Sequence, residues 1–157
     1  VKKNQLLYIH VSHLRSTTHM QKTLAIVKPD GVANGYVGEV IRRIEAEGLR
    51  IVAMRMEHMT QTKAEGFYYV HKERPFFNDL MKFMTEGPVV LMTLYGDDAI
   101  NRWRTLMGAT NPENADPGTI RKDMASNIER NVVHGSDAEE TAAFEVNYFF
   151  DGNDIMV

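Results

Sequence analysis

The last strand and the last helix predicted for this chain meet in Asn131-Val132-Val133-His134-Gly135-Ser136-Asp137. The two valines form a short apolar segment, which we predict to be a strand. Ser136 and Glu139 have the Ser-x-x-Glu spacing of a capping box, so we predict that a helix begins here. Apolar residues then recur about every four positions, as an amphipathic helix requires. They are Ala138, Ala142, Val146 and Phe149.

His134 therefore lies between a buried strand and the amino end of a helix. Backbone N–H groups and the helix dipole favour negative charge at such a position. A neutral imidazole beside an anion can attack a phosphoryl group through a ring nitrogen. Taken alone, the segment also fits a histidine that only packs or lies on the surface, with Ser136 acting only as a cap.

Upstream, short apolar runs predict three further strands, at residues 24–27, 49–59 and 89–95. In the second of these, Val52, Met54 and Met56 are expected on one face. The first is expected to end in the turn Lys28-Pro29-Asp30-Gly31, because proline fixes φ and glycine permits a tight corner.

Helical spacing of apolar residues predicts the helices between these strands. The first helix contains Val37, Val40, Ile41 and Ile44 and ends at Gly48, and a short second one is opened by a Thr62–Glu65 capping box and runs through Phe67, Tyr68 and Tyr69. The third begins near Pro75, contains Phe77, Leu80, Met81 and Met84 and ends at Gly87-Pro88. The fourth contains Ala99, Trp103, Leu106 and Met107 and ends at Gly108.

The resulting order, β-α-β-α-α-β-α-loop-β-α, predicts an α+β fold. Strict alternation of strand and helix would favour a doubly wound parallel sheet, and this chain lacks it. We therefore predict a ferredoxin-like, split βαβ plan: a four-stranded antiparallel sheet with helices packed on it.

The composition restricts the class of protein. The chain of 157 residues has a formal net charge of −3, 43% hydrophobic residues and no cysteine. The charge gives no reason to expect a specific nucleic-acid or anionic-membrane partner, and no apolar run approaches the roughly 18 residues of a membrane span. The lack of cysteine agrees with a reducing compartment, and we expect a cytoplasmic protein.

Residues 1–20 differ from the rest of the chain, since they hold three histidines and three cationic residues but no acidic one. We interpret them as an expression leader or a native extension, so that His10, His13 and His19 have no predicted function. Residues 21–157 are then one domain, with Met20 as the native start.

Phosphate binding would require side chains, because the chain has neither G-x-x-x-x-G-K-[ST] nor G-x-G-x-x-G. The cationic candidates are Lys28, Arg74, Arg104 and Arg121, and the hydroxyl candidates are Tyr68 and Thr110. Each of these alone could equally be a surface residue. No motif for direct metal binding is present.

The sequence resembles the nucleoside diphosphate kinase family in six motifs that occur in the family's order. They are Ala25-Ile26-Val27-Lys28-Pro29-Asp30, His71-Lys72-Glu73-Arg74-Pro75-Phe76-Phe77, Gly87-Pro88-Val89-Val90, Met107-Gly108-Ala109-Thr110-Asn111-Pro112, Pro117-Gly118-Thr119-Ile120-Arg121 and the segment around His134. The similarity covers about residues 21 to 150.

The resemblance implies a ping-pong transfer of the γ-phosphoryl group from a nucleoside triphosphate, typically ATP, to a nucleoside diphosphate. His134 would carry it as phosphohistidine. Phe76 and Ile128 would enclose the base, Lys28 and Asn131 would hold the ribose, and Tyr68, Arg104, Thr110 and Arg121 would hold the phosphates. Ser136 and Glu145 would orient the imidazole, and Asp137 would meet Mg²⁺ through water, the Mg²⁺ being carried in by the nucleotide.

The resemblance also implies a homo-oligomer built from dimers, whether a dimer, a tetramer or a hexamer. Two alternatives stay open from the residues themselves. One is a non-catalytic ligand-binding or regulatory module on the same fold. The other is nucleic-acid binding through aromatic residues of the sheet, which would need a basic surface that this chain lacks.

Overall fold

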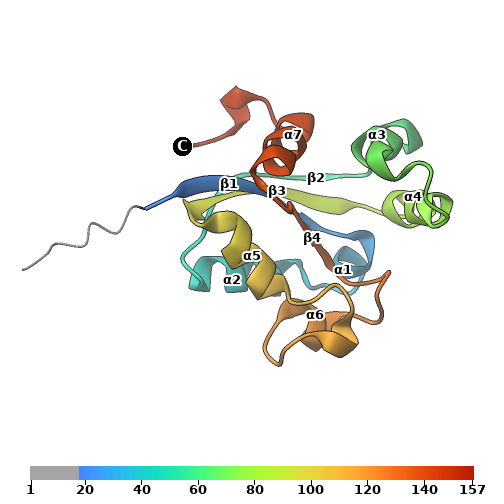
Figure 1. Cartoon of the computed structure of the whole chain (residues 1–157), viewed down its shortest axis with the longest axis horizontal. Helices are drawn as coiled ribbons and strands as arrows, with labels where there is room; N and C mark the ends of the chain where they lie inside the picture. The colour runs from blue at the N-terminus through green and yellow to red at the C-terminus, as the bar shows by residue number, and fades with distance from the viewer. Residues whose placement is uncertain (1–17) are drawn as a thin grey trace, which may run out of the picture.

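The computed structural model describes residues 18–157, and its centre is one four-stranded antiparallel sheet with the strand order β2-β3-β1-β4 (Figure 1). The strands are β1 (Met20–Val27), β2 (Arg50–Glu57), β3 (Val89–Asp97) and β4 (Val133–Gly135). The predicted fold class is confirmed. His10 and His13 lie outside the described residues, and β1 begins at Met20, one residue before the predicted domain boundary.

Helices cover both faces of the sheet (Figure 1). On one face lie α3 (Gln61–Phe67), α4 (Phe77–Thr85) and α7 (Glu139–Phe149), and on the other lie α1 (Pro29–Ala33), α2 (Val37–Ala46), α5 (Ala99–Met107) and α6 (Ile120–Met124). Single 3-10 turns follow α3, α5 and α7, at Tyr69–His71, Pro112–Asn114 and Gly152–Asp154.

This two-sided covering explains the apolar run at the end of β1. Alternate side chains of a strand point to opposite faces. Leu24 and Ile26 accordingly pack with α3, α4 and α7, whereas Ala25 and Val27 pack with α2 and α5. All four are fully buried, so this part of the central strand shows no alternation of polar and apolar residues in its sequence.

Two predicted local features are wrong near the start of helices. The predicted turn at Lys28-Pro29-Asp30-Gly31 is the beginning of α1, in which Pro29 occupies a first-turn position that needs no N–H donor. The cap of α3 is Thr60 instead of Thr62, since the Thr60 hydroxyl accepts a hydrogen bond from the Lys63 N–H at 3.1 Å. Pro75 lies two residues ahead of α4.

The predicted cap by Ser136 is also wrong. Helix α7 begins at Glu139, with Ala138 as its N-cap residue, and Ala138 is exposed instead of belonging to the buried stripe. The Thr141 hydroxyl accepts a hydrogen bond from the Ala138 N–H at 2.9 Å. Ser136 is fully buried, and its hydroxyl has other partners, described below.

Strand β2 lies at an edge of the sheet and contains a bulge. Ile51 pairs with Leu94 and Ala53 with Thr93, so that Val52 is the extra residue. Val52 is buried, but Met54 and Met56 are 54% and 60% exposed, so the predicted common face is broken at the bulge. The C-terminal segment returns to this strand, where the Met156 N–H donates to the Val52 carbonyl at 2.8 Å.

No helix within residues 18–157 is long and apolar enough to span a membrane.

Candidate functional site

His134 lies in β4, the edge strand opposite β2, and its backbone is fixed on two sides. It is the register partner of Ile26 in β1, and its carbonyl accepts a hydrogen bond from the Trp103 indole of α5 at 3.1 Å. The ring packs edge-on against Phe67, with centroids 5.5 Å apart. Only 20% of the side chain is exposed, so the imidazole is held in one place at the margin of the core.

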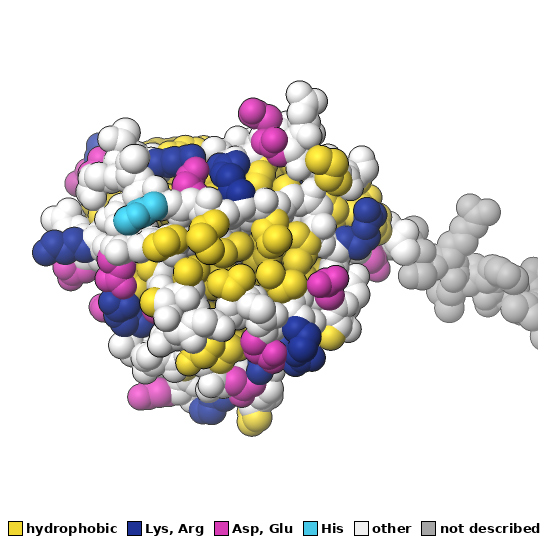
Figure 2. Space-filling view, turned by 180° about the vertical axis from the view of Figure 1, so that it is seen from behind, with side chains coloured by type: hydrophobic (Ala, Val, Ile, Leu, Met, Phe, Trp, Pro, Cys, Tyr) yellow, Lys and Arg dark blue, Asp and Glu magenta, His cyan; other side chains and the backbone are white. Residues whose placement is uncertain are grey.

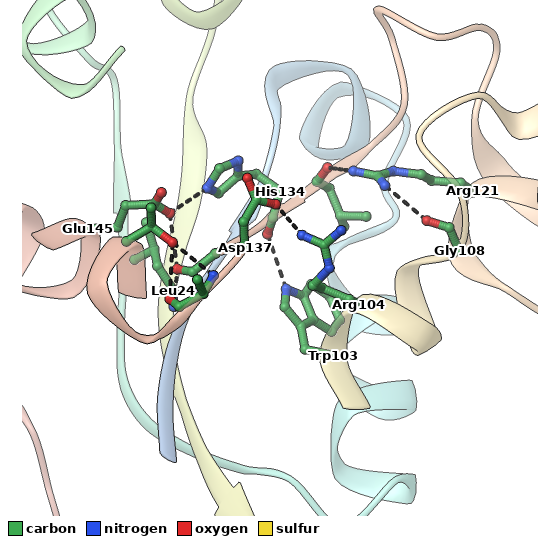
Figure 3. A network of polar contacts seen from close by, with 12 residues as sticks. Leu24, Trp103, Arg104, Gly108, Arg121, His134, Asp137 and Glu145 are labelled. Carbon is green, nitrogen blue, oxygen red and sulfur yellow. Dashed lines mark hydrogen bonds and ion pairs between the residues drawn. The ribbon is translucent and has the colours of Figure 1, made fainter. Parts of the chain in front are cut away.

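The imidazole is oriented by Glu145 of α7. His134 Nε2 lies 2.7 Å from Glu145 Oε1 (Figure 3). An ionised carboxylate only accepts hydrogen bonds, so this contact places a proton on Nε2. Nδ1 then carries the free lone pair of the neutral ring, which makes it the nucleophilic nitrogen.

Ser136 fixes the carboxylate in turn. Its hydroxyl donates to Glu145 Oε1 at 3.0 Å and accepts from the Leu24 N–H of β1 at 3.2 Å. The buried serine thus links a central strand to Glu145 and through it to the imidazole. The three side chains therefore lie together, in an arrangement that the orienting role predicted for Ser136 and Glu145 would require.

The backbone just before His134 is strained. Val132 has φ of +73°, a value that is rare for a β-branched residue, and the Val133 N–H donates to the Asn131 carbonyl at 2.8 Å across it. The strained peptide is held by the start of α1. Asp30 Oδ2 accepts from the Val132 N–H at 3.0 Å, and the Lys28 N–H donates to the Val132 carbonyl at 2.8 Å.

Gly135 follows His134 because nothing larger fits there. A Cβ atom at this position would lie 2.6 Å from Met107 Cε and 2.6 Å from Trp103 Cδ1. The close approach of α5 to β4 therefore depends on a residue without a side chain, and the same approach brings the Trp103 indole to the His134 carbonyl.

Beside His134 the surface opens into a cavity of about 650 Å³. A cavity of this size accommodates a ligand of nucleotide dimensions. Seven of the predicted site residues line it. They are Lys28, Tyr68, Phe76, Thr110, Ile128, Asn131 and His134.

Two apolar side chains of the cavity are unusually exposed. Phe76, the N-cap residue of α4, is 49% exposed, and Ile128 is 54% exposed. Both were predicted to enclose a base. Large apolar groups left open to solvent in a cavity are available for a flat, apolar ligand.

Lys28 and Asn131 form a polar pair deeper in the cavity. Lys28 Nζ donates to Asn131 Oδ1 at 2.8 Å, while Asn131 Nδ2 donates to the carbonyls of Thr110 and Ile128, both at 3.1 Å. Burial, reinforced by the positive charge of Arg121, lowers the pKa of Lys28 to about 8. Asn131 thereby ties together the Lys28 amine and the backbone of two other cavity residues.

Tyr68 contributes a hydroxyl to the same cavity. The side chain is buried, and its hydroxyl has no hydrogen-bond partner among residues 18–157. Burial, followed by the negative charge of Glu145, raises the pKa of Tyr68, so the group stays protonated at neutral pH. An unpaired buried hydroxyl is costly, and a ligand oxygen in the cavity would satisfy it.

The other predicted phosphate ligands, Arg104 and Arg121, do not line this cavity. Arg104 of α5 forms an ion pair with the exposed Asp137 (Figure 3). Arg121 of α6 donates to the carbonyls of Gly108 and Val133, at 3.0 and 2.8 Å. Burial, followed by the charge of Arg104, lowers the pKa of Arg121 to about 10.

These two hydrogen bonds give Arg121 a structural role that its position in the sequence did not indicate. By binding Val133, it holds β4 immediately before His134. It also brings a buried positive charge close to the segment that carries His134, where charge of that sign favours an anionic ligand.

Several cavity residues were missed by the sequence reasoning. The most prominent is Arg130, which pairs with Glu86, the C-cap residue of α4, and stacks on Phe83. Asp30, which does not line the cavity but holds Val132, was also missed. The members of each contact lie far apart in the sequence, and no periodic pattern or motif links them.

Within residues 18–157, no group of three or more histidine or acidic side chains is arranged to hold a metal ion.

Comparison with known proteins identifies the family. The family model for nucleoside diphosphate kinase matches residues 21–155. The chain belongs to the nucleoside diphosphate kinase family. This confirms the family and the phosphotransferase class predicted from the six motifs.

Individual nucleoside diphosphate kinases show how far the similarity extends. The enzyme of Desulfosudis oleivorans is 65% identical over 137 residues, which are 87% of this chain and 99% of the relative. The crystal structure from Aquifex aeolicus is 42% identical and superposes with a TM-score of 0.86, covering 87% of this chain and 99% of that one. A halophilic nucleoside diphosphate kinase from Halobacterium salinarum, solved in complex with CDP, is 38% identical with a TM-score of 0.85, covering 88% and 93% of the two chains.

Phosphoryl transfer between nucleotides is the role of this family, and the relatives match this chain across nearly the whole nucleoside diphosphate kinase domain.

Proposed function

We propose that His134 is the nucleophile of a ping-pong nucleoside diphosphate kinase reaction. The observation that carries this proposal is the hydrogen bond from His134 Nε2 to Glu145. It leaves Nδ1 with a lone pair, on a ring that lines a cavity of nucleotide size.

In the first half-reaction, Nδ1 attacks the γ-phosphorus of a nucleoside triphosphate. The N–P bond forms, the bond from this phosphorus to the β,γ-bridging oxygen breaks, and the nucleoside diphosphate leaves with the electron pair. The ring gains positive charge as it becomes phosphohistidine, and the Glu145 carboxylate 2.7 Å away stabilises that charge. In the second half-reaction, a terminal phosphate oxygen of an acceptor diphosphate attacks the same phosphorus and restores the imidazole.

The cavity walls support the predicted binding roles. Phe76 and Ile128 would enclose the base, and contact with base faces discriminates little between bases. Lys28 and Asn131 would meet the ribose hydroxyls. The halophilic relative was solved in complex with CDP, a nucleoside diphosphate, which supports a ligand of the same class here.

The phosphates would lie between His134 and the gap that Phe76 and Ile128 enclose, which we call the base slot. The unpaired Tyr68 hydroxyl and Thr110 are on the cavity wall, and Arg104 and Arg121 add positive charge from the side. Arg104 would exchange its Asp137 partner for a phosphate oxygen. Arg121, with two N–H groups already bound to carbonyls, would act mainly through its charge.

Mg²⁺ would enter with the nucleotide. Asp137 offers an exposed carboxylate, a hard oxygen ligand of the type that Mg²⁺ prefers, and contact through water suits an ion that gives up its hydration reluctantly. When bound, the ion neutralises phosphate charge and aligns the displacement.

Residues 21–157 would work as one nucleoside diphosphate kinase domain in a cytoplasmic homo-oligomer built from dimers. The edge strand β2 supports the assembly, because it exposes Met54 and Met56. This strand lies at the back of Figure 1, and Figure 2, drawn from behind, shows hydrophobic side chains gathered on that side. An exposed apolar sheet edge readily pairs with a second copy.

The test is intact mass after mixing the protein with Mg-ATP and no acceptor. We expect a gain of one acid-labile phosphoryl group, discharged by added GDP or CDP and absent in His134→Ala. The matched control is His58→Ala, which removes an exposed histidine whose ring bonds the Thr85 carbonyl, and it should label as the wild type does.

Two results would contradict the proposal. Full transfer by His134→Ala would show that another residue is the nucleophile. Nucleotide binding by the wild type without any labelling would favour the non-catalytic module.

A further inference from the structure

A tight loop carries Ile128 at its tip. The Asn127 side-chain oxygen accepts from the Glu129 and Arg130 N–H groups, both at 2.9 Å, and the Ser126 N–H donates to the Arg130 carbonyl at 3.1 Å. These bonds make residues 126–130 a compact unit. Ile128 nevertheless remains 54% exposed, so the loop itself does not bury the side chain that it presents.

Arg130 joins this loop to α4. Its guanidinium group donates to Glu86 Oε1 at 2.7 and 2.8 Å and to Oε2 at 3.0 Å. It also lies over the Phe83 ring, 5.0 Å from the centroid. Glu86 is the C-cap residue of α4, and Phe76 is the N-cap residue of the same helix.

The ion pair thus connects the two walls of the predicted base slot. We propose that the Arg130–Glu86 ion pair is a positioning device for nucleotide binding, which holds Ile128 at a fixed distance from Phe76. This inference rests on the proposed function, because it takes the gap between these two side chains as the place of the base.

The effect on nucleotide affinity follows from the fraction of molecules in which the base slot has the right width for a base. Helix α4 carries Phe76 at its N-cap, whereas the loop with Ile128 is attached to that helix by the Arg130 side chain. Without the ion pair, the loop would hold Ile128 at the distance from Phe76 that suits a base for a smaller fraction of the time. Apparent affinity falls in proportion to that fraction.

The expected size of the effect is modest. Arg130 and Glu86 side chains are 44% and 41% exposed, and exposed ion pairs are weak, though bidentate geometry and ring stacking strengthen this one. We expect KM and Kd to rise about three- to fivefold for every nucleotide, whichever base it carries. The rate at saturation should be nearly unchanged, because His134 and its partners are not touched.

A direct contact between Arg130 and the nucleotide is the competing explanation, and Glu86 separates the two. If Arg130 positions the loop, Arg130→Gln and Glu86→Gln should raise KM by the same factor, and the double variant should be no worse than either. If Arg130 binds the nucleotide itself, Glu86→Gln would release it from its partner and would lower KM.

The experiment measures KM, kcat and ADP, GDP and CDP dissociation constants for these three variants and for the exchanged pair Glu86→Arg with Arg130→Glu. The exchanged pair should recover part of the wild-type affinity. The matched control is Arg42→Gln, which breaks an exposed, bidentate ion pair with Glu39 on α2 and should leave KM unchanged. Melting temperatures should be equal for Arg42→Gln and Arg130→Gln.

Unchanged KM in both single variants, or opposite changes in the two, would overturn the positioning role. A loss of kcat together with a lower melting temperature would show that the pair is merely structural. These results differ from a failure of the proposed function, in which the wild type itself would not be phosphorylated. The Kd values would test the ion pair even then, and a wild type that binds no nucleotide would overturn both proposals.

Discussion

Replacing Glu145 by Gln tests the orientation and activation of the nucleophile. Glu145 Oε1 accepts hydrogen bonds from both His134 Nε2 and the Ser136 hydroxyl, and the side chain is only 14% exposed. Glutamine has nearly the same shape and can keep an amide oxygen in the same place. The substitution therefore removes the negative charge while it preserves the packing of α7.

The size of the effect follows from the change in the hydrogen bond. A bond to a charged group contributes about 1.5 to 3 kcal/mol, and one between neutral groups about 0.5 to 1.5 kcal/mol. The difference applies mainly when the imidazole gains positive charge, that is, in the transition state. A loss of about 1 to 2 kcal/mol corresponds to phosphoryl transfer slowed by about 5- to 30-fold.

The assay is rapid-quench measurement of phosphohistidine formation from Mg-ATP in a single turnover. We expect Glu145→Gln to slow this step while nucleotide Kd stays near the wild-type value, because Glu145 does not line the cavity. The control is Glu140→Gln, which neutralises an exposed carboxylate in the first turn of the same helix. Equal rates for Glu145→Gln and the wild type would refute the reasoning that the carboxylate charge assists the attack.

Three further predictions concern the cavity and its support. Phe76→Ala should weaken the binding of ADP, GDP and CDP alike, by about 1 to 3 kcal/mol. The control Phe144→Ala, at an exposed phenylalanine of α7, should leave binding unchanged. A loss of affinity for only one of the three nucleotides would mean that the site recognises the edges of the bases and not their faces. Since the pKa of Lys28 is about 8, its positive charge is lost as the pH rises between about 7 and 9, so calorimetry should show weaker ADP binding over this range, and Lys28→Gln should flatten the dependence. Gly135→Ala should lower the free energy of unfolding by about 1 to 3 kcal/mol through its clash with α5, while Gly38→Ala, in open space on α2, should raise it by about 0.5 to 1 kcal/mol; a thermal melt that ranks the two variants the other way would contradict the packing argument.

The fold could be predicted because hydrophobic periodicity reports burial directly. The apolar run from Leu24 to Val27 gave β1, and the stripe that contains Met81 and Met84 gave α4. The predictions that failed were those that had to choose a helix cap among neighbouring polar residues. Thr62 has the capping-box partner Glu65 in sequence and Thr60 has none, yet α3 begins at Gln61 with Thr60 as its cap.

Ser136 illustrates the same limit at the site. Its spacing to Glu139 fits a capping box, yet its hydroxyl bonds Glu145 and the Leu24 N–H instead. The competing partner is a backbone group 112 residues away in sequence, and no local pattern can reveal it. The resemblance to the family indicated the orienting role that the local pattern obscured.

The cavity was predicted in part for a related reason. Phe76 and Asn131 belong to motifs that the sequence displays, Ile128 was assigned through the resemblance alone, and all three line the cavity. The Arg130–Glu86 pair joins residues 44 apart and belongs to no motif, so its existence depends on the loop and α4 meeting in space.

Val132 links these observations to catalysis. A β-branched residue at φ of +73° costs about 1 to 3 kcal/mol, which the fold must offset elsewhere. The offset comes from complete burial of Val132 and from the bonds of its N–H and carbonyl to Asp30 and Lys28. Because the same lysine reaches Asn131 with its amine, the backbone that presents His134 and the side chains that would hold the ribose form one connected unit. Relaxing the strained turn would therefore move His134 and these side chains together, so on the proposed roles this connection would keep a bound nucleotide in register with His134.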